Sequence, residues 1–227
     1  MARAIDSAHV PTLANAYNFK AILEMLRGDT GAAQRPAESL IELGQKHGLK
    51  LFLTAGELYV SWAHARLGDR ATDATELRRA LAASADQGTK LHVPFCQGLL
   101  AEIEAEADNA DSALSRVDKA LELAGETGER WSDAFLHRSR GEILLRRDPA
   151  NPAAAEEAFL TAIAIAQQQK ARSFELRAAL SLAKLYQSTG RPADAHAVLA
   201  PALEGFSPTT EFPEIAEAQG LLVSLLP

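Results

Sequence analysis

The chain has 227 residues, 47% of them hydrophobic and 6% aromatic, with 23 Lys and Arg against 30 Asp and Glu. The net charge of −7 disfavours a nucleic-acid surface, because neutralising phosphates requires a clustered excess of basic side chains. No apolar run approaches the roughly 18 residues of a membrane span, and residues 1–12 lack the apolar core of a secretory signal. A single cysteine, Cys96, cannot form a disulfide within the chain, so we expect a cytoplasmic protein without membrane contact.

The predicted elements are all helical. Ala and Leu dominate, β-branched residues are sparse, and apolar residues recur at steps of three and four between turn residues. Residues 2–8 resemble the end of a helix whose beginning is missing. The pattern then predicts helix hairpins at about 12–46, 51–86, 94–124, 130–169 and 172–203, followed by a capping helix at 213–226.

Prolines refine these boundaries. Pro36 lies within the first hairpin's second helix, which predicts a kink or a late helix start. Pro94 suits a first helical turn, and so does Pro152 after an Asn151 cap. We expect Pro201 to bend or end its helix.

Turn residues recur with a fixed period along the chain. One set is 40 residues apart and then 42 apart, and comprises Gly28, Gly68, Asp108, Asp148 and Gly190. A second set, half a period on, is 40 apart and then 43 apart, and comprises Gly48, Gly88, Gly128 and Ala171. Two breaks per period imply two helices per period. The sequence therefore predicts an all-α, right-handed superhelical solenoid of five hairpins, forming one domain.

Several units match the tetratricopeptide pattern of large, small, aromatic, turn and packing residues. In the fifth hairpin these are Leu182, Ala183, Tyr186, Gly190, Ala195, Leu199 and Ala202, and in the fourth they are Gly141, Ala155, Phe159 and Ala162. Over nearly the whole chain, segments such as GERWSDAFLHRSRGEILLR resemble the MalT-like repeats of bacterial signalling proteins that also carry adenylate/guanylate cyclase and AAA ATPase modules. This chain has no phosphate-binding G-x-x-x-x-G-K-[ST] motif and no room for a cyclase domain, so we expect a fragment of a longer polypeptide or a stand-alone relative.

No pattern indicates catalysis. The six histidines lie at no i, i+4 spacing and in no H-E-x-x-H motif, so no metal site is predicted. Cys96 lies among apolar residues and reads as a buried packing residue. We expect a chain without enzymatic activity, cofactor or metal.

The surface predicted to bind a partner is the concave face, which the first helix of each hairpin lines in a tetratricopeptide stack. The resemblance places these candidates there: Asn18, Tyr59, Trp62, Arg66, Glu102, Glu106, Arg138, Glu142, Arg146, Arg177 and Lys184. Tyr, Trp and Arg commonly carry binding energy at interfaces. The alternative is that some of them only pack between helices or pair across the groove, for example Glu102 and Glu106 with Arg138.

Two functions follow from this surface. The first is a scaffold that binds a protein or peptide, and the mixture of Arg and Glu favours it. The second is a sensor that holds a small ligand in the groove. The Lys and Asn pattern of carboxylate-clamp repeats is absent, so a chaperone tail is not the expected ligand.

The ends of a solenoid expose the faces that a further repeat would cover. The predicted helix at 213–226 caps one end. At the other end we expect Leu13, Tyr17 and Leu23 to be exposed, so the sequence predicts self-association through the N-terminal hairpin.

Overall fold

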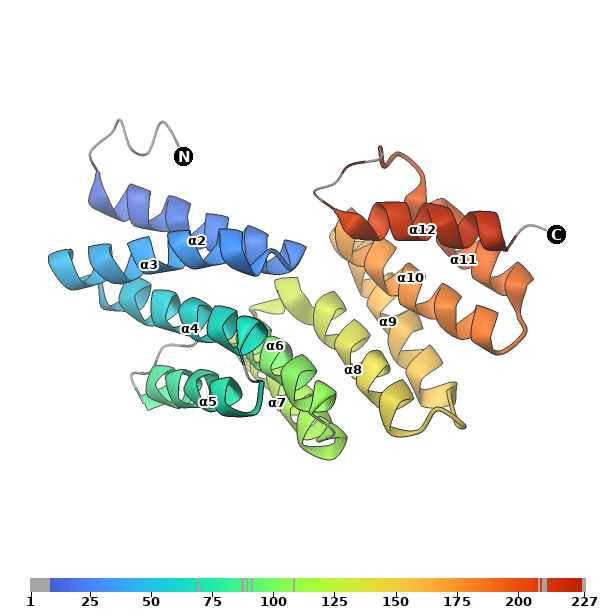
Figure 1. The fold of residues 1–227 in the computed structure, drawn as a ribbon, viewed down its shortest axis with the longest axis horizontal. Helices are drawn as coiled ribbons and strands as arrows, with labels where there is room; N and C mark the ends of the chain where they lie inside the picture. Colours follow the sequence, from blue (N-terminus) through green and yellow to red (C-terminus); the bar gives the residue numbers. More distant parts are fainter. Residues whose placement is uncertain are drawn as a thin grey trace. The chain divides into compact units, whose positions relative to one another are not determined.

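The computed structural model describes residues 9–68, 70–86, 88, 90, 92–107, 109–207, 209 and 212–225, with residues 70–73 described by backbone alone. Their regular structure is helical, as Figure 1 shows, and no strand occurs among them. The helices are α2 (Val10–Arg27), α3 (Thr30–His47), α4 (Lys50–Leu67), α5 (Arg70–Asp86), α6 (Val93–Glu106), α7 (Ala110–Thr127), the short 3-10 helix η1 (Arg130–Ser132), α8 (Asp133–Arg147), α9 (Ala153–Gln169), α10 (Arg172–Ser188), α11 (Pro192–Leu203) and α12 (Pro213–Ser224). The all-α prediction is confirmed. The predictions for residues 2–8, Asp108 and Leu226 lie outside the described residues.

Most predicted breaks fall where helices end. Gly28, Gly48 and Gly128 follow α2, α3 and α7 in left-handed backbone conformation, with φ between 67° and 73°. The prediction of Ala171 as the equivalent break is wrong by one residue. Lys170 takes the left-handed position at φ 56°, and Ala171 is the residue before α10.

Prolines behave partly as expected. Pro94 lies in the first turn of α6, and α11 ends two residues after Pro201. The prediction for Asn151 and Pro152 is wrong by one residue, because Pro152 is the N-cap and α9 begins at Ala153. Of the kink or late helix start predicted for Pro36, the late start is wrong, because α3 already begins at Thr30. There the Asp29 carboxylate accepts a hydrogen bond of 2.9 Å from the Ala32 amide. This cap stabilises the first turn ahead of the proline.

The chain comprises two compact units, residues 1–107 and 108–227. The division falls inside the third predicted hairpin, between α6 and α7, and the single-domain assignment stays a prediction. Within each unit, every helix packs against the next one in the chain. In addition, α2 contacts α4 and α4 contacts α6 in the first unit, while α8 contacts α10 and α10 contacts α12 in the second. We call α2, α4 and α6 the row helices of the first unit, and α8, α10 and α12 the row helices of the second unit.

Hydrogen bonds between row helices repeat the sequence period. Tyr59 and Asn18 are 41 residues apart, Arg66 and Glu106 are 40 apart, Ser181 and Glu142 are 39 apart, and Arg177 and Glu214 are 37 apart. These four hydrogen bonds each join residues about one period apart, as stacked helical repeats would.

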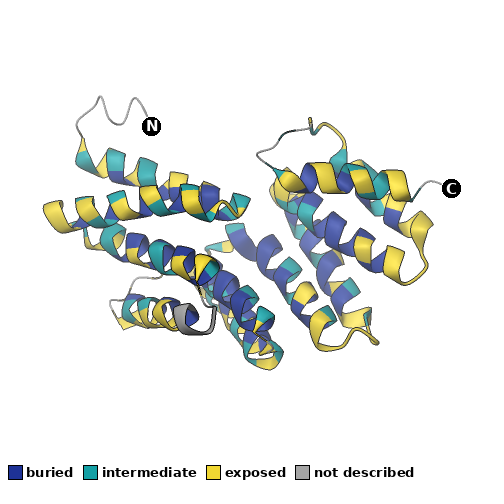
Figure 2. Ribbon diagram, in the orientation of Figure 1, coloured by how far each residue is buried: buried dark blue, intermediate teal, exposed yellow. Residues whose placement is uncertain are grey.

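Glycines allow the helices to approach closely. A Cβ atom on Gly44 of α3 would lie 2.6 Å from Leu53 Cβ, and one on Gly56 of α4 would lie 2.8 Å from the Ala37 carbonyl oxygen. A Cβ on Gly141 of α8 would lie 2.6 Å from Phe159 Cδ1. Figure 2 shows the buried residues along the faces where helices of each unit meet. Glycines at these contacts thus allow the short distances between neighbouring helices in both units.

Candidate functional site

Three of the predicted groove residues lie inside the first unit. Asn18 of α2 and both Tyr59 and Trp62 of α4 are almost completely buried. The Tyr59 hydroxyl donates to Asn18 Oδ1 at 3.0 Å, and Asn18 Nδ2 lies 3.3 Å from Nε2 of buried His92, the residue before α6. These side chains join the row helices of this unit. They therefore pack between helices, which was the alternative interpretation of the sequence, and offer a partner almost no surface.

The remaining candidates of the first unit form one ion-pair cluster. Arg66 of α4 donates to Glu102 at 3.2 Å and to Glu106 at 3.1 Å, both on α6, and all three side chains are partly exposed. Both carboxylates thus share Arg66 as a partner within the first unit. The pairing of Glu102 and Glu106 with Arg138 stays a prediction.

The candidates of the second unit meet on its row helices. Along α8, Arg138, Glu142 and Arg146 follow at intervals of four residues, so they share one helix face. The Arg138 guanidinium lies 3.7 Å from Glu142 and 5.7 Å from the centre of the Phe135 ring. The hydroxyl of Ser181 on α10 donates to Glu142 at 2.6 Å.

The same surface continues from α10 to α12. Arg177 donates to Glu214 at 2.6 Å, and Lys184 pairs with Glu217 at 2.7 Å. We call the eight residues Arg138, Glu142, Arg146, Arg177, Ser181, Lys184, Glu214 and Glu217 the row face of the second unit. The sequence analysis missed Ser181, Glu214 and Glu217. Each is found 33 to 39 residues from its partner, so searching one period along for a complementary polar residue could have identified them.

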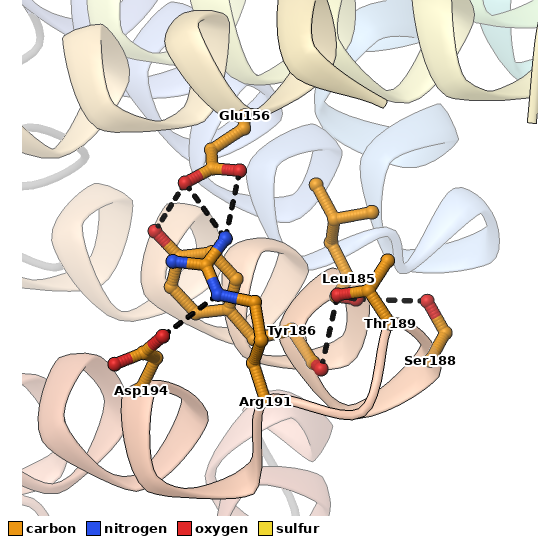
Figure 3. Close-up of polar contacts among 7 residues, drawn as sticks. All are labelled: Glu156, Leu185, Tyr186, Ser188, Thr189, Arg191 and Asp194. Carbon is orange, nitrogen blue, oxygen red and sulfur yellow. Dashed lines mark hydrogen bonds and ion pairs between the residues drawn. The ribbon is translucent and has the colours of Figure 1, made fainter. Parts of the chain in front are cut away.

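A second polar cluster lies between α9, α10 and α11, and Figure 3 shows its arrangement. The Tyr186 hydroxyl donates to Glu156 Oε1 at 2.9 Å, and Arg191 donates to both Glu156 oxygens and to Asp194 Oδ2. The Arg191 guanidinium lies 4.0 Å from the centre of the Tyr186 ring.

The pKa values of Tyr186 and Arg191 in this cluster are both raised. Burial, and then the hydrogen bond to Glu156, raise the pKa of Tyr186, while the hydrogen bonds to Asp194 and Glu156 raise the pKa of Arg191. The tyrosine thus stays neutral and the arginine charged near neutral pH. The cluster joins α9, the end of α10 and the start of α11.

Metal-binding and membrane features were sought in the described residues. They contain no group of three or more His, Cys, Asp or Glu side chains that could hold a metal. None of their helices has both the length and the apolar character needed to cross a membrane. Cys96 is buried in α6, and burial lowers the pKa of His137 on α8.

An open depression of about 540 Å³ lies apart from the row face of the second unit, at the end of α11. Its lining consists of Ala200, Pro201, Leu203, Glu204, Phe206 and Gln219. Arg172 of α10 supports it, because its guanidinium donates to the carbonyls of Ala202 and Glu204 at 3.2 and 2.7 Å and lies 5.6 Å from the centre of the Phe206 ring.

The comparisons with known proteins leave the family open. No protein-family model matches the chain. An uncharacterised protein of Rhizobium meliloti (strain 1021) is 23% identical over 184 residues, which cover 81% of this chain. The aligned segment spans only 18% of that relative, so this chain is similar to a small part of a much longer protein.

Proposed function

We propose that the chain is a non-catalytic scaffold of the tetratricopeptide type, a right-handed solenoid that binds a protein or peptide along the row face of the second unit. The observation that supports this is the gathering of Arg138, Glu142, Arg146, Arg177 and Lys184, predicted from the sequence as binding residues, on α8 and α10. The resemblance to bacterial signalling repeats supports a cytoplasmic role in signalling.

The chemistry of this face suits an exchangeable partner. Lys184, Glu217 and Glu142 are about half exposed, and such ion pairs contribute only about 0–1 kcal/mol to stability. A partner that supplies its own carboxylates and cations can therefore replace these ion pairs with little loss of stability. The alternating charges of Arg138, Glu142 and Arg146 along α8 would determine the partner's register more than its affinity.

Charge reversal on the row face tests the proposal. The variant carries Arg146→Glu with Lys184→Glu, and its control carries Lys119→Glu with Lys170→Glu, an equal charge change at exposed positions outside the row helices. Partners are captured from bacterial lysate with cross-linking, purified, and titrated calorimetrically against each protein. We expect at least a tenfold loss of affinity for the row-face variant only. Equal affinities of both variants for every captured protein would contradict this binding surface.

A small-ligand sensor is the second candidate function. The depression at the end of α11 supports it, and we expect the ligand to bind in this depression and not on the row face. A library of small apolar molecules, followed by thermal unfolding, tests this idea. A ligand of the depression should lose its stabilising effect in a Gln219→Trp variant and keep it in the row-face variant.

A further inference from the structure

The first and last row helices each present an apolar face to solvent. In the first unit α2 packs against α3 and α4, and in the second unit α12 packs against α10 and α11. Away from these contacts, Phe19 and Leu23 of α2 are 60% and 45% exposed, and Val223 of α12 is 70% exposed. Large apolar side chains at this exposure are unfavourable in water, so both faces are candidates for contact with another protein.

The face of α2 is a short apolar ridge. Phe19 and Leu23 are one helical turn apart and lie next to Lys20, whose ammonium pairs with Glu24 of the same helix and remains about half exposed. The sequence predicted Leu13 and Tyr17 beside Leu23, but both are only partly exposed, and Phe19 takes their place.

The face of α12 is a shallow apolar strip. Ala216 and Gly220 are exposed, one turn apart, and precede Val223. A Cβ on Gly220 would meet no atom within 4 Å, unlike one on Gly44, Gly56 or Gly141. A glycine inside a helix costs about 1 kcal/mol relative to alanine, and no packing contact of the described chain requires this one. Beside the strip lies Glu217, half exposed and paired with Lys184.

We propose that the α2 face of one copy of this chain packs head to tail on the α12 face of a second copy. The ridge of Phe19 and Leu23 fits the strip where Ala216 and Gly220 lack bulky side chains. Lys20 then meets Glu217 of opposite charge. Row contacts within the chain have the same composition, apolar packing flanked by cation–carboxylate pairs such as Arg177 with Glu214.

This contact joins two different surfaces, so each added copy leaves one of each surface open. Head-to-tail contacts of this kind produce rings or open filaments, whereas contact between two identical α2 faces would stop at a dimer. The stoichiometry in solution therefore distinguishes the two arrangements.

The test uses two single variants and a control. Phe19→Glu disables the α2 face, Val223→Glu disables the α12 face, and Leu160→Glu introduces the same charge at an exposed leucine of α9. Sedimentation velocity is measured on the full chain over a wide concentration range, with circular dichroism to establish that each variant is folded. Wild type and Leu160→Glu should grow beyond dimers as concentration rises, and each face variant alone should be monomeric.

Mixing the two face variants gives the decisive result. Each retains one intact face, so an equimolar mixture should form a dimer and nothing larger. A wild type that stays monomeric, a mixture that stays monomeric, or a Val223→Glu variant that still dimerises would overturn the proposal. Neither variant alters the row face of the second unit, so failure here is separate from failure of the scaffold function.

Discussion

Lys170 takes a backbone conformation that glycine takes at the ends of three other helices. Its φ of 56° resembles those of Gly28, Gly48 and Gly128, which follow α2, α3 and α7. A residue with a Cβ atom is strained there, because that atom crowds the neighbouring carbonyl oxygen, at a cost on the order of 1 kcal/mol. The end of α9 is therefore less favourable than those of its counterparts.

Exchanging residues at this position should change stability in opposite directions. We expect Lys170→Gly to raise the free energy of unfolding by up to about 1 kcal/mol and Gly128→Ala to lower it by about the same amount. A Cβ on Gly128 meets no atom within 4 Å, so that loss would reflect the backbone alone. Urea unfolding measures the stability of both variants. A destabilised Lys170→Gly protein would contradict the strain assigned to Lys170.

At the scale of the helices, α3 and α4 approach each other through two glycines. The Cβ of an alanine at position 56 would lie 2.8 Å from the Ala37 carbonyl oxygen, and backbone atoms cannot rotate away as a side chain can. Overpacking costs about 1–3 kcal/mol, which exceeds the gain of about 1 kcal/mol in helix propensity.

We therefore expect Gly56→Ala to lower the urea midpoint of unfolding. Gly125→Ala is the matched control, because Gly125 also lies within a helix, α7, and its Cβ would have no neighbour within 4 Å. The control should be neutral or stabilised by up to about 1 kcal/mol. If both variants had the same midpoint, the close approach of α3 and α4 would not depend on this glycine.

The helices were predictable because turn glycines, prolines and apolar spacing act locally. Every hairpin boundary from Thr12 to Leu203 falls within three residues of a helix end, where only the neighbouring sequence matters. Burial on α4 was not predictable, because it depends on contacts between helices, such as that of Tyr59 with Asn18 of α2, 41 residues away. Helical periodicity cannot separate a face covered by the next row helix from an open one. The row face of the second unit was predictable in part, since the resemblance to tetratricopeptide repeats had placed five of its residues on the first helices of the fourth and fifth hairpins.

At the scale of the whole chain, each unit carries one tryptophan. Trp62 is buried in the first unit and Trp131 lies in the second, so Trp131→Phe and Trp62→Phe chains each report on one unit by fluorescence. Gly141→Ala should destabilise the second unit, since its Cβ would lie 2.6 Å from Phe159 Cδ1.

We expect Gly141→Ala to lower the urea midpoint reported by Trp131 and to leave the midpoint reported by Trp62 unchanged. Stability in repeat proteins is a sum of local contributions, so distant reporters need not move together. Equal shifts of both midpoints would instead show one cooperative domain, as the sequence analysis predicted.

The hydrogen bond between Asn18 and His92 has a consequence for the order of folding. It closes a stretch of 74 residues, whereas Tyr59 reaches Asn18 over 41. The entropy lost on closing a loop grows with its length, by about 0.6 kcal/mol for each doubling, so short-range contacts form first. The bond between Asn18 and His92 spans the longer stretch, so we expect it to form after the bond between Tyr59 and Asn18. Weakening it should then accelerate unfolding and leave the folding rate nearly unchanged.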